Sequence, residues 1–483
     1  MFDPVIITQV TQIFMAFAAI LLTSEVCNLA RMKAGDFSRN SGKLPLSRCL
    51  LYLIFRNCKD TSSELSKFFA SIDSNSEQPS RQAVNKRLRR LNSTVWTYLS
   101  QKFTDLVYGS DKLTGTLNGY AVWATDSSSL EMPYSKEAED KFGMHRNNHS
   151  KKDSTAGKVL ARCGGLYDVL NRFFIDYRIE AFKNSEMSML IQQVRMFAYM
   201  LKDHKIIILG DRGYISLQLL ILLELLGYSY CIRAKRSTYK AEVGRMNSND
   251  EHIEIKITNT LLSRITEPDV RAYLEGCNAF RVRVVKKYWT NPKTGAQELI
   301  LYYTNLSQEK FDTDAIIDLY RLRWRIETAY GSLKSILELE RHISTNPEVA
   351  LNVLYGKIMF YNFSSLFREP LEQLITFEET TQSDDKRNQY HYQVNAKALT
   401  IQLYAENLVK CLIVGNDISK HVSTLFQDLY VLRNKMKTPI REDRHYERWG
   451  KPVTCSHKHR FRIDGRNHPK VALIGGVLRT VQP

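Results

Sequence analysis

The chain has 483 residues, a formal net charge of +17, 43% hydrophobic residues and 25% charged residues. This balance excludes an intrinsically disordered chain, and the length predicts about two to four domains with a large core. The basic excess indicates a polyanionic partner, with nucleic acid first and a membrane surface second. The eight cysteines form no CxxC pair, which favours a reduced, cytoplasmic protein over a disulfide scaffold.

Residues 13–22 (IFMAFAAILL) form an apolar run that resembles the core of a signal peptide. The residues before it include Asp3 and no lysine or arginine, so the positive region of such peptides is missing. The run is also too short to cross a bilayer. We expect a buried helix here, with neither secretion nor a membrane anchor.

Residues 1–112 are predicted to form a mostly helical, DNA-binding domain. A short helix over 62–70 is followed by a polar turn, and Ser80 is placed to cap a second helix over 81–91 (RQAVNKRLRRL). Helix, turn and basic helix match the shape of a helix-turn-helix motif, although a solvated basic face explains the same spacing. On the first interpretation, four cations of the second helix contact DNA: Arg81, Lys86, Arg87 and Arg90.

The segment 113–235 alternates apolar strands with helices. Two of its strands are separated by Asn171 and Arg172, which predicts a hairpin. The predicted order is three strands, a helix, a strand, a helix and a strand, which indicates a mixed α/β sheet. The strands and helices outside the hairpin cover residues 120–126, 185–201, 205–211, 217–226 and 228–233.

The rest of the chain changes character along its length. Residues 236–304 are polar and rich in predicted strands, as expected of an insertion within the α/β core. Residues 305–372 are assigned to the second part of the core, with a long helix over 314–339 and another that begins after Asn346. Residues 373–483 are predicted to form a helical and then basic region for dimerisation and DNA contact.

Two acidic residues stand at the carboxyl ends of apolar strands. Asp126 ends the predicted strand 120–126, and Asp211 ends the predicted strand 205–211. In an open α/β sheet, ligand-binding groups gather at the carboxyl ends of the strands. Each aspartate also suits a turn or a cap position, so neither residue alone identifies a site.

Four polar side chains share one face of the predicted long helix. Tyr320, Arg323, Glu327 and Lys334 fall within a stripe about 60° wide when each residue turns the helix by ~100°. An i,i+4 ion pair on a solvated face also explains Arg323 and Glu327. The stripe borders the buried face of the helix beside Trp324, which favours a site at the edge of the core.

The segment 320–334 (YRLRWRIETAYGSLK) resembles the Y-x2-R-x3-E-x6-K signature of bacterial insertion-sequence DDE transposases, with all four positions matched. The segment 208–214 (ILGDRGY) resembles the surroundings of that family's second aspartate. The predicted strand that ends at Asp126 resembles the surroundings of the first aspartate. The resemblance covers residues 120–365 and implies an RNase H-like core. The catalytic residues and metal ligands that it implies are Asp126, Asp211 and Glu327.

The resemblance also implies two Mg²⁺ ions, for which Mn²⁺ can substitute. Two divalent ions about 3.5–4 Å apart activate the attacking oxygen and stabilise the leaving oxygen of a phosphodiester. Such ions prefer hard oxygen ligands, as carboxylates provide. Asp126 would bridge the ions, and Asp211 and Glu327 would each complete one. The residues that would hold phosphates of the DNA end are Tyr320, Arg323 and Lys334.

One position departs from this family. Its members can cut the second strand through a DNA hairpin, with a flipped base stacked on tryptophan, and Trp324 is one such surface. Ile300 stands where a second stacking tryptophan is expected, with Tyr288 and Trp289 as nearby substitutes. The route of second-strand cleavage is therefore open.

We expect a cut-and-paste transposase in the bacterial cytoplasm, associated with the nucleoid. It would bind the terminal inverted repeats of its own element in double-stranded DNA, pair two ends as a homodimer and join their 3′ hydroxyls to target DNA. Two alternatives are a non-catalytic DNA binder, such as a repressor or domesticated transposase, and an RNase H-like nuclease without strand transfer. The three acids disfavour the first, and the 320–334 signature disfavours the second.

The C-terminal region has its own ambiguous features. Residues 433–483 are basic with interleaved aromatic residues, which suits either a surface that follows DNA phosphates or a solvated tail. Cys455, His457 and His459 have ligand chemistry, but no second pair stands at zinc-finger spacing. We therefore predict no zinc site there.

Overall fold

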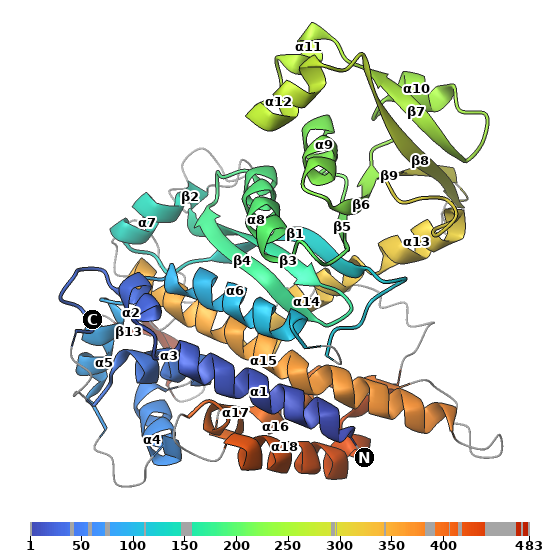
Figure 1. The fold of residues 1–483 in the computed structure, drawn as a ribbon. Coiled ribbons are helices and arrows are strands. Elements are labelled where there is room, and N and C mark those ends of the chain that lie inside the picture. The colour runs from blue at the N-terminus through green and yellow to red at the C-terminus, as the bar shows by residue number, and fades with distance from the viewer. Residues whose placement is uncertain are drawn as a thin grey trace.

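A computed structural model shows a large mixed sheet with helices from both ends of the chain packed beneath it (Figure 1). The model describes residues 2–38, 43–56, 60–72, 78–110, 113–145, 157–290, 295, 297–341, 344–381, 392–404, 406–413, 418–439, 470–474 and 477–481.

The described N-terminal part is helical, as predicted. The apolar run 13–22 lies in α1 and the turn after it, and its inner face is buried. Phe14 and Phe17 contact the ring of Phe363, with centroids 5.0 and 4.9 Å apart, so α1 is a core helix. The helices are α1 (Pro4–Ile20), α2 (Ser24–Ala30), α3 (Leu46–Phe55), α4 (Thr61–Ile72), α5 (Arg81–Leu88) and α6 (Val95–Tyr108).

The centre of the sheet has the strand order β4-β3-β1-β5-β6. β1, β5 and β6 run parallel, whereas β3 and β4 are antiparallel to their neighbours. This is the RNase H-like order, so the predicted fold class is confirmed. The elements are β1 (Ala121–Glu131), α7 (Lys136–Phe142), β2 (Met144–His145), β3 (Lys158–Asp168), β4 (Phe173–Ala181), α8 (Glu186–Met200), β5 (Ile206–Gly210), α9 (Leu217–Leu225) and β6 (Ser229–Ala234).

The predicted β3–β4 hairpin is also confirmed. Its turn contains Arg172 with a φ of 61°, and the carboxylate of Asp168 accepts hydrogen bonds from the backbone N–H groups of Leu170 and Asn171, both at 2.9 Å. The same buried carboxylate accepts a bond from the Tyr108 hydroxyl at 2.6 Å. These bonds stabilise the turn on the N-terminal helices, because a buried carboxylate needs several donors.

The strands of residues 236–304 continue the core sheet. β9 pairs with β6, and the order goes on as β9-β8-β7. Arg195 on α8 clamps the amino end of α12 through Glu267 and Asp269, at 2.6 and 2.7 Å. The elements are α10 (Lys240–Gly244), β7 (Asp250–Lys256), α11 (Asn259–Leu262), α12 (Pro268–Glu275), β8 (Ala279–Thr290) and β9 (Gln297–Thr304).

The prediction of one helix over 314–339 is wrong. The structure has two helices, α13 (Thr313–Arg321) and α14 (Trp324–Ser335), joined at Leu322 and Arg323. Across the junction the backbone N–H groups of Leu322, Arg323 and Arg325 bond three residues back instead of four, so the chain there forms a tighter turn than an α-helix. No proline or glycine lies at the junction, so residue type carried no signal of the break.

α15 (Pro347–Thr380) is 34 residues long and connects the N-terminal helices to the sheet. It begins after Asn346, as predicted, and the Asn346 side chain accepts a bond from the Val349 N–H at 3.1 Å. Asn352 accepts a bond from the Trp96 indole, and Asn362 bonds both backbone groups of Phe174, each at 2.8 Å. These buried amides hold the helix in one register against both partners.

The chain after α15 is helical and then forms short strands. Arg433, a predicted tail cation, pairs with Glu378 at 2.6 Å and stacks on Tyr430, so it belongs to the folded part. Residues 440–469, including the Cys455, His457 and His459 cluster, lie outside the described residues. The elements are β10 (Tyr392–Val394), α16 (Ala396–Leu403), α17 (Glu406–Lys410), α18 (Ile418–Leu432), η2 (Arg433–Lys435), β11 (Lys437–Pro439), β12 (Lys470–Ile474) and β13 (Val477–Val481).

Within the described ranges, no single helix is long and apolar enough to cross a membrane. α1 and α2 pass that test only as a pair, and they are bent by 62° relative to each other.

Gly356 is a test of how closely α15 packs on α3. A methyl group at this position would stand 2.5 Å from the backbone oxygen of Leu53, which cannot move without moving α3. Gly356→Ala should therefore lower the free energy of unfolding by about 1–3 kcal/mol, as overpacked cores do. Chemical denaturation measures this change. The control is Gly331→Ala on the exposed face of α14, where no atom lies within 4 Å and the substitution should be neutral or stabilising.

Candidate active site

The two predicted aspartates lie on neighbouring chain segments where the parallel pairing of β1 and β5 ends, at one edge of the sheet. The prediction that Asp126 ends its strand is wrong, because β1 continues to Glu131 through its pairing with β3. β1 and β5 are parallel with Ala124 opposite Leu209, so continuing the register by two residues brings Asp126 opposite Asp211. Neighbouring strands lie about 4.8 Å apart, which puts the two side chains within reach of a common ligand. Asp211 follows β5 directly, and its Oδ1 accepts the Gly213 N–H at 2.7 Å.

Arg323 brings Glu327 to the same edge. It lies at the amino end of α14, with a side chain only 9% exposed. Its Nη2 donates to Glu327 Oε1 at 2.6 Å, and its Nη1 lies 3.9 Å from Asp126 Oδ2. A buried guanidinium thus stands between two of the three predicted carboxylates.

The surroundings of Asp126 oppose its ionisation. Burial raises the pKa of this carboxyl to about 6, and the nearby Glu327 and Asp211 charges act in the same direction. The Ser127 N–H, which donates to Asp126 Oδ1 at 2.9 Å, and the Arg323 guanidinium partly offset this shift. Carboxyl groups whose pKa is raised by burial and by neighbouring charges are typical of functional sites.

The three carboxylates suit a hard divalent cation by donor type. Asp126 Oδ1 accepts the Ser127 N–H and its Oδ2 faces Arg323, whereas Asp211 Oδ2 and Glu327 Oε2 accept no hydrogen bond from the described residues. As placed, no group of three His, Cys, Asp or Glu side chains in the described ranges is close enough to hold a metal ion. Arg323 supplies the positive charge between Asp126 and Glu327 instead.

Arg323 and Tyr320 leave hydrogen-bonding capacity for an anion. Arg323 Nε is buried with no hydrogen-bond partner among the described residues. Its guanidinium carbon lies 5.7 Å from the centre of the Tyr320 ring, which in turn packs on Tyr302 at 4.9 Å. Burial raises the pKa of Tyr320 to about 12, so its hydroxyl stays a neutral donor. A phosphate oxygen is the type of acceptor that would suit the Arg323 Nε–H and the Tyr320 hydroxyl.

Lys334 lies farther along α14 and bonds to β1. Its Nζ donates to Ser128 Oγ and to the backbone oxygen of Ser129, both at 2.8 Å. The ammonium group therefore lies beside the strand that bears Asp126, because Ser128 and Ser129 follow Asp126 by two and three residues on β1.

The aromatic candidates are mostly exposed. Trp324 is 59% exposed beside the Arg323 guanidinium. Tyr288 and Trp289 are also exposed, on β8, while Ile300 on β9 is half-buried opposite Lys287. Alternation along the strands places Trp289 on the same face as Ile300, so it is the better-placed substitute for the missing tryptophan.

The basic face of α5 contains one inward-facing cation. Ser80 caps the helix by accepting the Ala83 N–H at 3.2 Å, as predicted, but the helix ends at Leu88 instead of residue 91. Arg87 is half-buried and stacks on the Phe37 ring at 4.1 Å. Arg81, Lys86 and Arg90 are exposed.

Tyr330 was missed in the sequence because it belongs to the apolar stripe of its helix. Its hydroxyl donates to the backbone oxygen of Asp126 at 2.8 Å, which ties α14 to β1 next to the carboxylates. Periodicity indicates only that the ring is buried, and the partner of the hydroxyl depends on the strand that packs against it.

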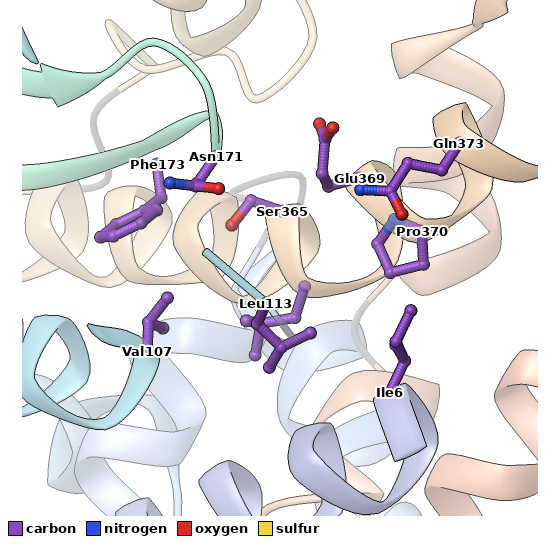
Figure 2. A pocket seen from close by; sticks show the side chains of 10 residues that line it. Ile6, Val107, Leu113, Asn171, Phe173, Ser365, Glu369, Pro370 and Gln373 are labelled. Carbon is purple, nitrogen blue, oxygen red and sulfur yellow. The ribbon is translucent and has the colours of Figure 1, made fainter. Parts of the chain in front are cut away.

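The pocket in Figure 2 lies away from this edge. It is a small gap between α1, α6, α15 and the β3–β4 turn. Glu369 borders it, facing Arg172 at 3.5 Å, and burial raises the pKa of this glutamate. None of the predicted site residues lines the pocket.

An RNase H-like sheet with carboxylates on β1, directly after β5 and on a helix beside them is typical of enzymes that cut or join phosphodiesters. Residues 118–363 match the family model described as a transposase DDE domain. The chain belongs to this family. It is a DNA transposase, an enzyme of DNA cleavage and strand transfer, and its family generally uses divalent metal ions.

The chain is similar to transposases of two insertion sequences and, weakly, to one solved transposase structure. The transposase for insertion sequence element IS1151 of Clostridium perfringens is 21% identical over 380 residues, which cover 69% of this chain and 76% of that protein. The transposase for insertion sequence element IS421 of Escherichia coli is 27% identical over 89 residues, which cover 18% of this chain and 23% of that protein. A solved piggyBac transposase synaptic complex with hairpin DNA has 10% identity and a TM-score of 0.38, covering 89% and 83% of the two chains.

Proposed function

We propose that this transposase excises and inserts an insertion sequence through a metal site formed by Asp126, Asp211 and Glu327. The observation that supports the proposal is that Asp126 and Glu327 both face the buried Arg323, while the β1–β5 register brings Asp211 beside Asp126. Two Mg²⁺ ions, or Mn²⁺ in their place, would supply the activation of the attacking oxygen and the stabilisation of the leaving oxygen. Asp126, Asp211 and Glu327 are the residues that would hold these ions, through carboxylate oxygens.

The cations and Tyr320 act on the DNA itself. Arg323 holds a phosphate of the cleaved end through its unpartnered Nε, and Tyr320 donates its neutral hydroxyl to the same strand. Lys334 exchanges its bonds to Ser128 and Ser129 for a phosphate when DNA binds. These contacts align the scissile bond with the carboxylates, and such positioning is a large part of phosphoryl-transfer catalysis.

The substrate that we propose is double-stranded DNA with the terminal inverted repeats of the element. Two ends are paired by a homodimer, freed from flanking DNA, and joined to target DNA through their 3′ hydroxyls. The exposed Trp324 and Trp289 offer stacking surfaces for an unpaired base, so a hairpin intermediate is compatible with the site.

The test is an assay of the purified full chain on DNA that spans one element end and its flank. With Mg²⁺ we expect nicking at the element boundary and, with a plasmid added, covalent joining of the 3′ end to it. With EDTA we expect end binding without either product. A protein that binds its ends but never cuts them in Mg²⁺ or Mn²⁺ would instead be the non-catalytic binder, and one that cuts without joining would be a nuclease.

The exposed cations of α5 should determine which DNA is recognised. Replacing Arg81, Lys86 and Arg90 together by glutamine should reduce the ratio of end to random-duplex affinity to about 1, because base contacts carry specificity. Arg87 is kept, since it packs on Phe37. Binding titrations at several salt concentrations measure the ratio. A matched triple variant of the exposed Lys183, Lys202 and Lys205 loses the same charge and should keep the preference for element ends. An unchanged affinity ratio in the variant of Arg81, Lys86 and Arg90 would show that these residues form a solvated basic face and not a recognition surface.

A further inference from the structure

Tyr330 links the glutamate helix to the first catalytic strand. It lies on α14 three residues after Glu327, and its hydroxyl donates to the backbone oxygen of Asp126 at 2.8 Å. The ring is buried and packs on Phe174 and Tyr177, with centroids 5.8 and 6.0 Å apart. A buried hydroxyl needs a partner, and the tyrosine finds it in Asp126, whose carboxylate faces the same Arg323 guanidinium as Glu327.

Gly165 makes room for this contact. It lies on β3 directly opposite Asp126 in the antiparallel register. A methyl group at Gly165 would stand 2.6 Å from the Tyr330 hydroxyl oxygen and 3.1 Å from the Phe174 ring. The first distance is shorter than carbon and oxygen tolerate, so any side chain here would displace the hydroxyl or the helix that carries it.

We propose that Tyr330 and Gly165, together the Tyr330–Gly165 brace, set the separation between the Asp126 and Glu327 carboxylates. Residues three apart lie on the same face of a helix, so a phenol tied to the Asp126 backbone orients Glu327 toward the Asp126 side chain. Tyr330 is a positioning residue, because it contacts the backbone of Asp126 and not its carboxylate. The inference rests on the proposed function, since it concerns metal binding by these acids.

Tyr330→Phe is the direct test, because it removes the hydroxyl and keeps the ring. Titration calorimetry of Mn²⁺ into the DNA-free full chain should show affinity weakened about 10- to 100-fold, as when residues that orient metal ligands are removed. The Mg²⁺ concentration for half-maximal end cleavage should rise by a similar factor, with activity restored at high metal. End binding in EDTA should not change.

Tyr177→Phe is the matched control. Tyr177 is a neighbouring buried tyrosine that packs on the same Phe174 at 5.2 Å, but its hydroxyl lies beside Cys163. This variant should bind Mn²⁺ like the wild type. Equal losses of Mn²⁺ affinity in both phenylalanine variants would assign the effect to general packing and overturn the brace.

Gly165→Ala tests the other half of the brace. It should weaken Mn²⁺ affinity at least as much as Tyr330→Phe. The double variant should be no worse than Gly165→Ala alone, because the closest clash is with the hydroxyl that phenylalanine lacks. A double variant whose loss of Mn²⁺ affinity equals the product of the two single losses would contradict the brace. If Gly165→Ala does not fold, Tyr330→Phe and Tyr177→Phe still decide the question.

The wild type separates this inference from the proposed function. A wild type that neither binds Mn²⁺ nor cleaves its ends contradicts the metal site as a whole. A wild type that does both, with Tyr330→Phe matching it at limiting metal, contradicts the brace alone.

Discussion

Asp126→Asn, Asp211→Asn or Glu327→Gln should each reduce cleavage of an element end by at least about 1000-fold. Each amide keeps the size of the side chain but loses the negative charge that holds a divalent ion, and a bound ion stabilises the transition state by several kcal/mol. Single-turnover cleavage with Mg²⁺ measures the loss. End binding in EDTA should stay within about twofold, since the acids do not attract the DNA backbone.

The matched control is Asp318→Asn, an exposed acid of α13 that pairs with Arg321. It should cleave like the wild type. Asp126→Asn should also melt no lower than the wild type, because burial disfavours the charged form of this carboxyl, whose pKa is raised to about 6. A variant that still nicks the end at a normal rate would remove its residue from the site.

Arg323→Ala should reduce cleavage by about 100-fold, the scale of losing one preorganised donor at a reacting phosphate. The guanidinium contacts Glu327, faces Asp126 and keeps an unpartnered Nε, so its loss removes a phosphate contact beside the acids. Arg323→Lys should recover little, because one ammonium cannot replace a planar fork of donors.

The comparison for this variant is Arg321→Ala, which removes an exposed guanidinium two residues away. End cleavage at saturating Mg²⁺, together with the affinity for a pre-cleaved end, distinguishes the roles. We expect Arg323→Ala to weaken engagement of the cleaved end while Mn²⁺ affinity changes little. Cleavage at the wild-type rate by Arg323→Ala would show that the proposed phosphate contact is wrong. An equal loss of cleavage in Arg321→Ala would show that the effect comes from the net charge of the protein and not from a specific contact.

Local features of the chain were predictable because their causes lie within a few residues. The apolar strand before Asp211, the β3–β4 hairpin and the caps at Ser80 and Asn346 follow from apolar runs and from turn and cap residues. The start of β1 was predicted in the same way, but its continuation past Asp126 to Glu131 depends on pairing with β3. The signature over 320–334 likewise identified the helix that bears Glu327, because each of its positions has a required side-chain type and spacing.

The elements that depend on distant partners were not predictable in this way. No local residue marks the break between α13 and α14. The pairing of β9 with β6, which makes the insertion part of the core sheet, joins segments about 70 residues apart, and such pairing depends on chain closure instead of local preference. Helical periodicity predicted the same DNA-contacting role for Arg87 as for the other cations of this segment. Only the tertiary structure shows that Arg87 packs on the Phe37 ring.

The sequence by itself determined which groups the proposed site contains: three acids, and the cations and tyrosine near Glu327. The tertiary structure decided how these groups meet. Arg323 lies between Asp126 and Glu327, Lys334 bonds to β1, and Tyr330 reaches Asp126 across Gly165. The contacts of Arg323, Tyr330 and Lys334 with β1 join residues about 200 positions apart. Their distances are set by the packing of a helix on a sheet, which no local pattern of residues encodes.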